Sequence, residues 1–331
     1  MSDSHYESLV VPARVIPLPK TISEQSRQVL ANPRMSMPVH YPPLDDKVAW
    51  KALIAEIDDR VEKMLSAALP KQGYKVDTQL IDSVVTYVVT PDDVSEGDPR
   101  VFLEFHGGGF SLGGGESCKM MAIAMALRTG ARVVSVDYRM PPDHPFPAAL
   151  DDAMVVYRAL LESHAPENIV VGGISAGGGL TAALALRSRD EGLPMPAGLI
   201  LMTPGVDLTI SGDTFHTLLG IDPVLPTPVP EMLQLYAGDT PLDHPYVSPV
   251  LGRFDAGFPA TFLQSGTRDL LLSSTVRMHR ALREVGVNAE LHVFEGMPHG
   301  GFGGTPEDME VTKELRRFLA ACWRHPPTAS R

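Results

Sequence analysis

The spacing of apolar residues changes character along the first third of the chain. Between Asp45 and Leu69 apolar positions recur at roughly helical spacing, and Pro70 ends the pattern. From Gln79 to Phe105 the apolar runs are short, rich in β-branched residues and separated by turn residues. The sequence therefore predicts one N-terminal helix followed by antiparallel strands that enter a sheet.

Predicted helices and strands alternate along the rest of the chain. Helices are expected over residues 117–129, 147–163, 176–189, 273–285 and 306–323, and strands over 132–136, 168–172, 198–202, 261–265 and 289–294. Such alternation is typical of a mostly parallel central sheet that helices cover on both faces. The sequence therefore predicts an α/β fold.

Residues 204–258 interrupt this alternation with many prolines and one short helical stretch near 229–236. The interval is too long for an ordinary connection. An insertion at the carboxyl ends of the strands would roof the place where open α/β sheets bind ligands. We expect a single domain, 1–331, with a cap from about 1–75 and 204–258 and a core from about 76–203 and 259–331.

A serine lies at one junction between a predicted strand and a predicted helix, in Gly173-Ile174-Ser175-Ala176-Gly177. Small flanking residues allow a sharp, strained turn that lifts the serine oxygen above the sheet, with the helix N-terminus directed at it. Ser175 is therefore the first candidate nucleophile. A five-residue pattern with two free positions also arises by chance, so this interpretation needs further support.

A second motif, His106-Gly107-Gly108-Gly109-Phe110, directly follows an apolar strand-like run. Successive glycines expose backbone N–H groups, which acyl transfer needs where negative charge develops on the carbonyl oxygen. A flexible surface loop and a phosphate cradle are the alternatives. A phosphate loop more usually ends in Gly-Lys-Ser/Thr, which is absent here.

A serine nucleophile needs a base and an acid that orients the base. His299 follows the predicted strand 289–294 within a glycine-rich loop, and Asp269 follows the strand before it. The resulting chain order of Ser175, Asp269 and His299 is the order expected of a hydrolase. An ion pair with Arg268 is the alternative, purely structural role for Asp269.

Composition and charge exclude some classes of binding partner and some cellular locations. The net charge of −12, without clusters of Lys and Arg, argues against binding of nucleic acid. The apolar stretch from Leu9 to Val11 is too short for a signal peptide or a membrane span, so we expect a cytoplasmic protein. Cys118 and Cys322 are expected to be reduced and structural. The inferred chemistry needs no metal and no cofactor.

Three blocks make the chain resemble the bacterial hormone-sensitive-lipase-like (family IV) carboxylesterases of the α/β-hydrolase fold. They are His106 to Phe110, the run Asp137-Tyr138-Arg139-Met140-Pro141-Pro142-Asp143-His144-Pro145-Phe146-Pro147 with its continuation to Asp152, and Gly172 to Gly178. The resemblance implies an oxyanion hole from the N–H groups of Gly107, Gly108 and Ala176, and a helical cap over an acyl-ester pocket. It also implies that His106 holds the glycine loop.

The chain departs from that family in three places. Ile174 stands where an acidic or small polar residue is common, Met140-Pro141-Pro142-Asp143 replaces Leu-Ala-Pro-Glu, and Asp269-Leu270-Leu271 replaces Asp-Pro-Leu. Each of these departures leaves the reacting groups in place. Relatives often pair through the last strand, here Ala289 to Phe294, so a homodimer is one expectation for the assembly.

The resulting hypothesis is a serine carboxylesterase that acts on small esters with short- to medium-chain acyl groups. Hydrolysis of a lactone, carbamate or amide by the same triad is the alternative. A third hypothesis is a non-catalytic receptor for small ligands, although such receptors typically lose the histidine that this chain retains as His299. The residues expected to line the pocket are Phe110, Leu112, Phe215, Leu218, Leu219, Tyr236 and Phe302.

Overall fold

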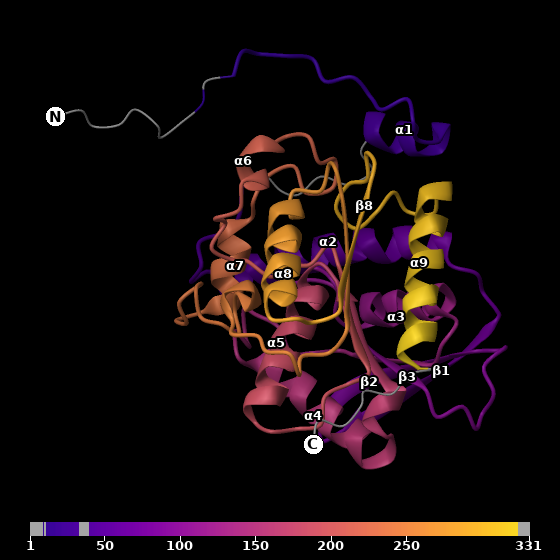
Figure 1. Ribbon diagram of the computed structural model, residues 1–331. Helices are drawn as coiled ribbons and strands as arrows, with labels where there is room; N and C mark the ends of the chain where they lie inside the picture. The colour runs from indigo at the N-terminus through magenta and orange to yellow at the C-terminus, as the bar shows by residue number, and fades with distance from the viewer. Residues whose placement is uncertain (1–8, 10, 33–39, 324–331) are drawn as a thin grey trace.

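The computed structural model describes residues 9, 11–32 and 40–323 (Figure 1). Parts of the expected cap and of the Leu9 to Val11 stretch, namely residues 1–8, 10 and 33–39, lie outside the described residues. The strands are β1 (Tyr74–Ile81), β2 (Val84–Pro91), β3 (Val101–Phe105), β4 (Val133–Val136), β5 (Ile169–Ile174), β6 (Gly198–Met202), β7 (Thr261–Gly266) and β8 (Ala289–Phe294). The α-helices are α1 (Glu24–Ala31), α2 (Lys47–Ala68), α3 (Glu116–Thr129), α4 (Ala148–Ser163), α5 (Ala176–Asp190), α6 (Thr214–Thr217), α7 (Pro230–Ala237), α8 (Leu272–Glu284) and α9 (Pro306–Cys322).

In the described part of the chain these strands form one eight-stranded sheet in the order β1-β2-β4-β3-β5-β6-β7-β8. The β1/β2 and β2/β4 pairs are antiparallel, and every later pair is parallel. Strand β5 occupies the middle of the sheet, where Gly173 pairs with Phe105 of β3 and with Leu201 of β6. The predicted α/β class with a mostly parallel sheet is confirmed.

Two hydrophobic cores lie on the two faces of the sheet. In β3, Leu103 belongs to the core shared with α4, α5 and α8, whereas Phe102 belongs to the core shared with α3 and α9. Figure 1 shows these two groups of helices on opposite sides of the strands. Because successive side chains of a strand point to opposite faces, a strand covered on both sides is apolar throughout, as β3 is apart from Glu104.

Helices from two distant parts of the chain meet above the glycine loop. Trp50 and Ile57 of α2 pack with Met232 and Leu235 of α7, and Leu112 joins the same cluster. Segment 204–258 also holds the short helix α6, which the proline-rich sequence did not predict. The structure therefore brings α2 and the segment 204–258 together on one side of the molecule.

Helix α1 was also not predicted, because prolines surround it. Its N-cap Ser23 accepts from the Ser26 N–H, and Glu307 at the start of α9 accepts from the Ser26 hydroxyl at 2.6 Å. These contacts fix α1 against α9.

None of the helices in the described part of the chain is both long enough and apolar enough to cross a membrane.

Candidate active site

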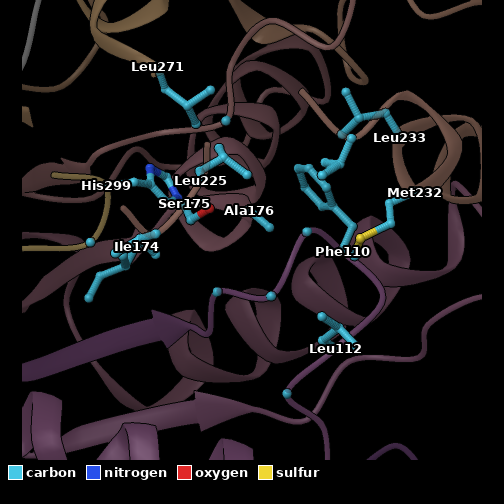
Figure 2. A pocket seen from close by; sticks show the side chains of 18 of the residues that line it. Phe110, Leu112, Ile174, Ser175, Ala176, Leu225, Met232, Leu233, Leu271 and His299 are labelled. Atoms are coloured by element: carbon cyan, nitrogen blue, oxygen red, sulfur yellow. Dashed lines mark hydrogen bonds between the residues drawn. The ribbon is translucent and has the colours of Figure 1, made fainter. Parts of the chain in front are cut away.

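Ser175 lies on the sharp turn between β5 and α5, with a positive φ of 57°. A positive φ is costly for a residue with a side chain, and this one is held by hydrogen bonds from Ser175 N to Met202 O (2.9 Å) and from Gly205 N to Ser175 O (2.8 Å). A Cβ built at Gly177 would lie 1.8 Å from the carbonyl oxygen of Phe105. The turn is therefore possible only because glycine lets the helix start approach strand β3. Figure 2 shows the Ser175 side chain facing the cavity.

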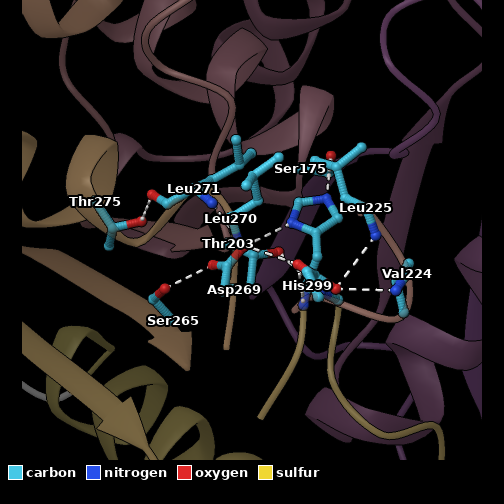
Figure 3. A network of polar contacts seen from close by, with 12 residues as sticks. Ser175, Thr203, Val224, Leu225, Ser265, Asp269, Leu270, Leu271, Thr275 and His299 are labelled. Atoms are coloured by element: carbon cyan, nitrogen blue, oxygen red, sulfur yellow. Dashed lines mark hydrogen bonds and ion pairs between the residues drawn. The ribbon is translucent and has the colours of Figure 1, made fainter. Parts of the chain in front are cut away.

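Three residues from separate loops meet in one hydrogen-bonded chain (Figure 3). His299 Nε2 lies 2.8 Å from Ser175 Oγ, and His299 Nδ1 lies 3.0 Å from Asp269 Oδ1. Asp269 is fully buried and also accepts from the Ser265 hydroxyl (2.6 Å) and from the Leu271 N–H (3.0 Å). The structure thus brings together the three residues expected from sequence, in an arrangement that can activate a hydroxyl group.

The alternative role for Asp269, an ion pair with Arg268, does not match the observed contacts. The Arg268 guanidinium donates to the carbonyl oxygen of Pro17 at 2.9 Å. The carboxylate of Asp269 contacts His299 instead.

Two opposing effects set the pKa of His299. Burial lowers it, but the hydrogen bond to Asp269 and the negative charges of Asp269 and Asp222 outweigh burial, so the pKa is raised above 6.5. The contact with Asp269 favours the tautomer in which Nδ1–H donates to the carboxylate. Nε2 is then free to accept a proton from Ser175.

The side chain of His106 holds the glycine loop, His106 to Phe110, in place. Its Nδ1–H donates to Gly107 O at 2.7 Å, and its ring stacks on Tyr138 with centroids 4.1 Å apart. Burial lowers the pKa of His106 to about 4, which keeps the ring neutral. Gly108 has a φ of 118°, and a Cβ there would lie 2.2 Å from Leu112 O, so no other residue fits.

The proposed oxyanion-hole residues Gly107, Gly108 and Ala176 all lie on the wall of the cavity that contains Ser175 and His299. A Cβ built at Gly107 would lie 3.6 Å from the Cβ of Ser175. The glycine loop therefore runs directly beside the serine.

The cavity has a volume of about 260 Å³ and a mainly apolar wall. Of the residues predicted to line it, Phe110, Leu112 and Phe215 do so. Its other apolar side chains come largely from α2 and from segment 204–258: Ile57, Val61, Leu208, Val224, Leu225, Val229, Met232 and Leu233. Ile174 also lines it, so the departure beside Ser175 places an apolar side chain at the site.

Four residues predicted for the wall lie elsewhere. Tyr236 is buried behind the wall, where its ring stacks on Phe110 at 4.1 Å, and Phe302 packs in the core beside α9. Leu218 packs against the cluster around Leu270, and Leu219 is 54% exposed. Proximity in sequence did not reveal which side of each loop or helix faces the cavity.

Asp58 and Asp222 are carboxylates near the site that the sequence did not assign to it. Asp58 on α2 lines the cavity, and its Oδ1 accepts from the Gly113 N–H at 2.9 Å. The pKa of Asp58 is raised to about 6, mainly by burial. The hydrogen bond from Gly113 lowers this pKa, and the charge of Glu62 raises it. A signal was present in the sequence, because Asp58 falls on the apolar face that Ile57 and Val61 form at helical spacing. The second carboxylate, Asp222, follows no comparable pattern.

Within the described residues, one group has the ligand types of a metal site: His106, Cys118 and Asp137, with ligand atoms within 4.8 Å of one another. Asp137 accepts from the Gly115 N–H (3.0 Å), and burial raises the pKa of the Cys118 thiol well above its usual range. The contact from Gly115, the N-cap residue of α3, therefore ties Asp137 to the start of that helix. Cys118 and Cys322 are both buried, and neither is part of a disulfide within the described residues.

Comparison with known proteins shows the fold family of the chain. Residues 102–302 match the family model described as alpha/beta hydrolase fold. An acetyl-hydrolase of Streptomyces hygroscopicus is 33% identical over 231 residues, which cover 69% of this chain and 70% of that protein.

Solved structures extend the similarity over nearly the whole chain. The crystal structure of an esterase superposes with a TM-score of 0.88 at 36% identity, over 95% of this chain and 98% of that one. An esterase from the bacterial hormone-sensitive lipase family gives a TM-score of 0.79 at 28% identity, over 91% and 99% of the two chains. The chain is a carboxylic ester hydrolase and belongs to the hormone-sensitive-lipase-like carboxylesterases of the α/β-hydrolase fold.

Proposed function

We propose that Ser175, His299 and Asp269 form the catalytic triad of this esterase. The observation that carries the proposal is the continuous chain of contacts, 2.8 Å and 3.0 Å long, that ends at a serine hydroxyl inside a cavity. Ser175 Oγ attacks the ester carbonyl carbon while its proton passes to His299 Nε2. Asp269 stabilises the imidazolium, which then protonates the departing alkoxide as the ester C–O bond breaks.

The acyl-enzyme is resolved by water. His299 Nε2 takes a proton from the water as its oxygen attacks the acyl carbon, and the same proton returns to Ser175 Oγ when the acid is released. The N–H groups of Gly107, Gly108 and Ala176 bind the oxyanion in both steps. The position of these three residues on the cavity wall beside Ser175 supports that role.

The substrates that fit best are small esters with short- to medium-chain acyl groups. A volume of about 260 Å³ is small for a ligand pocket, and its apolar wall favours an alkyl chain over a polar group. Lactones, carbamates and amides can react by the same steps, so a panel of these substrates distinguishes the classes.

Ser175→Ala tests the assignment. We expect turnover of 4-nitrophenyl butyrate to fall by roughly 10⁴-fold and fluorophosphonate labelling to disappear, since the nucleophile is removed. The control is Ser163→Ala, at the end of α4 outside the cavity wall, which is expected to keep wild-type turnover. Activity of Ser175→Ala within tenfold of wild type would contradict the proposal.

The proposals for cellular location and for assembly come from the amino-acid sequence. We propose a cytoplasmic protein and a homodimer that pairs through β8, the last strand of the sheet, where Val293 is partly exposed. Cell fractionation and light scattering of the purified protein test the two proposals.

A further inference from the structure

A buried carboxylate, Asp222, lies next to the triad and has no assigned role. It belongs to segment 204–258 and is only 1% exposed. Its two oxygens accept four backbone N–H groups within 3.2 Å. Hydrogen bonds to a charged group are strong, so four of them hold the Asp222 carboxylate in a fixed position.

The four donors come from three different loops. Oδ1 accepts from Val224 (2.9 Å) and Leu225 (3.2 Å) in the turn that follows Asp222 itself. Oδ2 accepts from Leu270 (3.0 Å), the residue after Asp269, and from His299 (3.2 Å). Figure 3 shows Val224, Leu225 and Leu270 around His299. One carboxylate thus joins the turn after Asp222 to the loops that carry the acid and the base.

The position of Asp222 also matters for charge. Its negative charge raises the pKa of His299, as does that of Asp269. Burial in turn raises the pKa of Asp222, while the charge of His299 and the backbone N–H donors lower it. The negative charge of Asp269 also raises the pKa of Asp222.

We propose that Asp222 is a positioning residue of the esterase, which fixes the backbones of His299 and of the Asp269 loop to segment 204–258 and places a second negative charge beside the imidazolium. The inference rests on the proposed triad. In the reaction the imidazolium forms when Ser175 gives up its proton, so a nearby buried anion stabilises the charge that develops. Hydrogen bonds to the backbone keep this anion from competing with Asp269 for Nδ1.

Asp222→Asn removes the charge and one of the two acceptor atoms while keeping the size of the side chain. We expect kcat for 4-nitrophenyl butyrate to fall on the order of 10- to 100-fold, since the base is less well positioned, with a smaller change in KM. We also expect the acid limb of the pH profile of kcat/KM to move to lower pH, because loss of a neighbouring anion lowers the pKa of His299.

Two further variants separate positioning from a general structural effect. Asp222→Glu keeps the negative charge and is expected to restore the acid limb toward wild type. Asp243→Asn removes an exposed carboxylate of the same segment and is expected to change neither kcat nor the pH profile. An acid limb in Asp222→Asn at the wild-type pH contradicts the proposal, whatever the loss in kcat.

Partial misfolding of Asp222→Asn does not prevent the test. The rate constant of fluorophosphonate labelling at Ser175 is measured only on competent molecules, so its pH midpoint can be read from a mixed preparation. A midpoint below that of wild type supports the proposal, and an equal midpoint overturns it. Failure of the triad itself is recognised separately, because Ser175→Ala would then retain activity.

Discussion

Replacement of Asp58 by asparagine is expected to stabilise the protein above pH 6. Asp58 is half-buried on the cavity wall, and its pKa is raised from its ordinary 3.8 to about 6, mainly by burial. One pKa unit corresponds to about 1.4 kcal/mol, so ionisation of Asp58 costs the folded state about 3 kcal/mol. Partial access to solvent reduces this cost to about 1–2 kcal/mol.

The sign of the pH dependence follows from the raised pKa. The folded state binds the proton of Asp58 more tightly than the unfolded state, so the wild type loses stability as pH rises from about 4 through 6. Asp58→Asn has no such loss and can still accept the Gly113 N–H through its amide oxygen. The variant is therefore expected to exceed wild type by about 1–2 kcal/mol at pH 8 and to approach it near pH 4.

Urea unfolding at pH 5, 6, 7 and 8 measures this difference. The matched control is Asp45→Asn, an exposed carboxylate just before α2, for which we expect no pH-dependent difference. A free energy of unfolding for Asp58→Asn at or below that of wild type at pH 8 would refute the reasoning. It would mean that the charged hydrogen bond to Gly113 outweighs the cost of burial.

The other predictions concern backbone contacts and the cavity wall. Gly177→Ala is expected to lower the free energy of unfolding by about 3 kcal/mol or more and to lower turnover, because its Cβ would lie 1.8 Å from Phe105 O. Gly97→Ala, where an added Cβ meets no atom within 4 Å, is the control in the same urea and turnover assays. Met232→Ala widens the cavity, so kcat/KM for 4-nitrophenyl octanoate relative to butyrate is expected to rise about fourfold for each methylene newly buried. An unchanged ratio across the ester series would show that Met232 does not limit chain length.

The sequence was sufficient for the parts of the site that depend on chain topology. Parallel strands bring their carboxyl ends to one edge of the sheet, so residues placed directly after β5, β7 and β8 had to converge there. This is why Ser175, Asp269 and His299 could be paired across more than a hundred residues. The glycine motifs also indicated the serine turn and the glycine loop, because few residues other than glycine tolerate such sharp turns and close backbone contacts.

The cavity wall was harder to predict, because it depends on how irregular segments pack. Tyr236 and Met232 lie one helical turn apart on α7, yet Met232 faces the cavity and Tyr236 lies behind Phe110. Asp222 sits in a proline-rich turn without periodicity, so only the folded chain shows that it contacts His299. Asp58 could have been noticed as a polar residue on an apolar helix face.

The contact between Gly177 and the backbone of Phe105 also bears on how such an enzyme can diversify. The serine turn approaches the main chain of Phe105 so closely that no side chain fits at Gly177, so this contact has no side chain that could vary. Mutations that alter substrate preference are therefore expected among the side chains of the cavity wall, most of which α2 and segment 204–258 contribute. Natural drift and laboratory libraries would both find variation tolerated there, while the reaction itself is inherited unchanged.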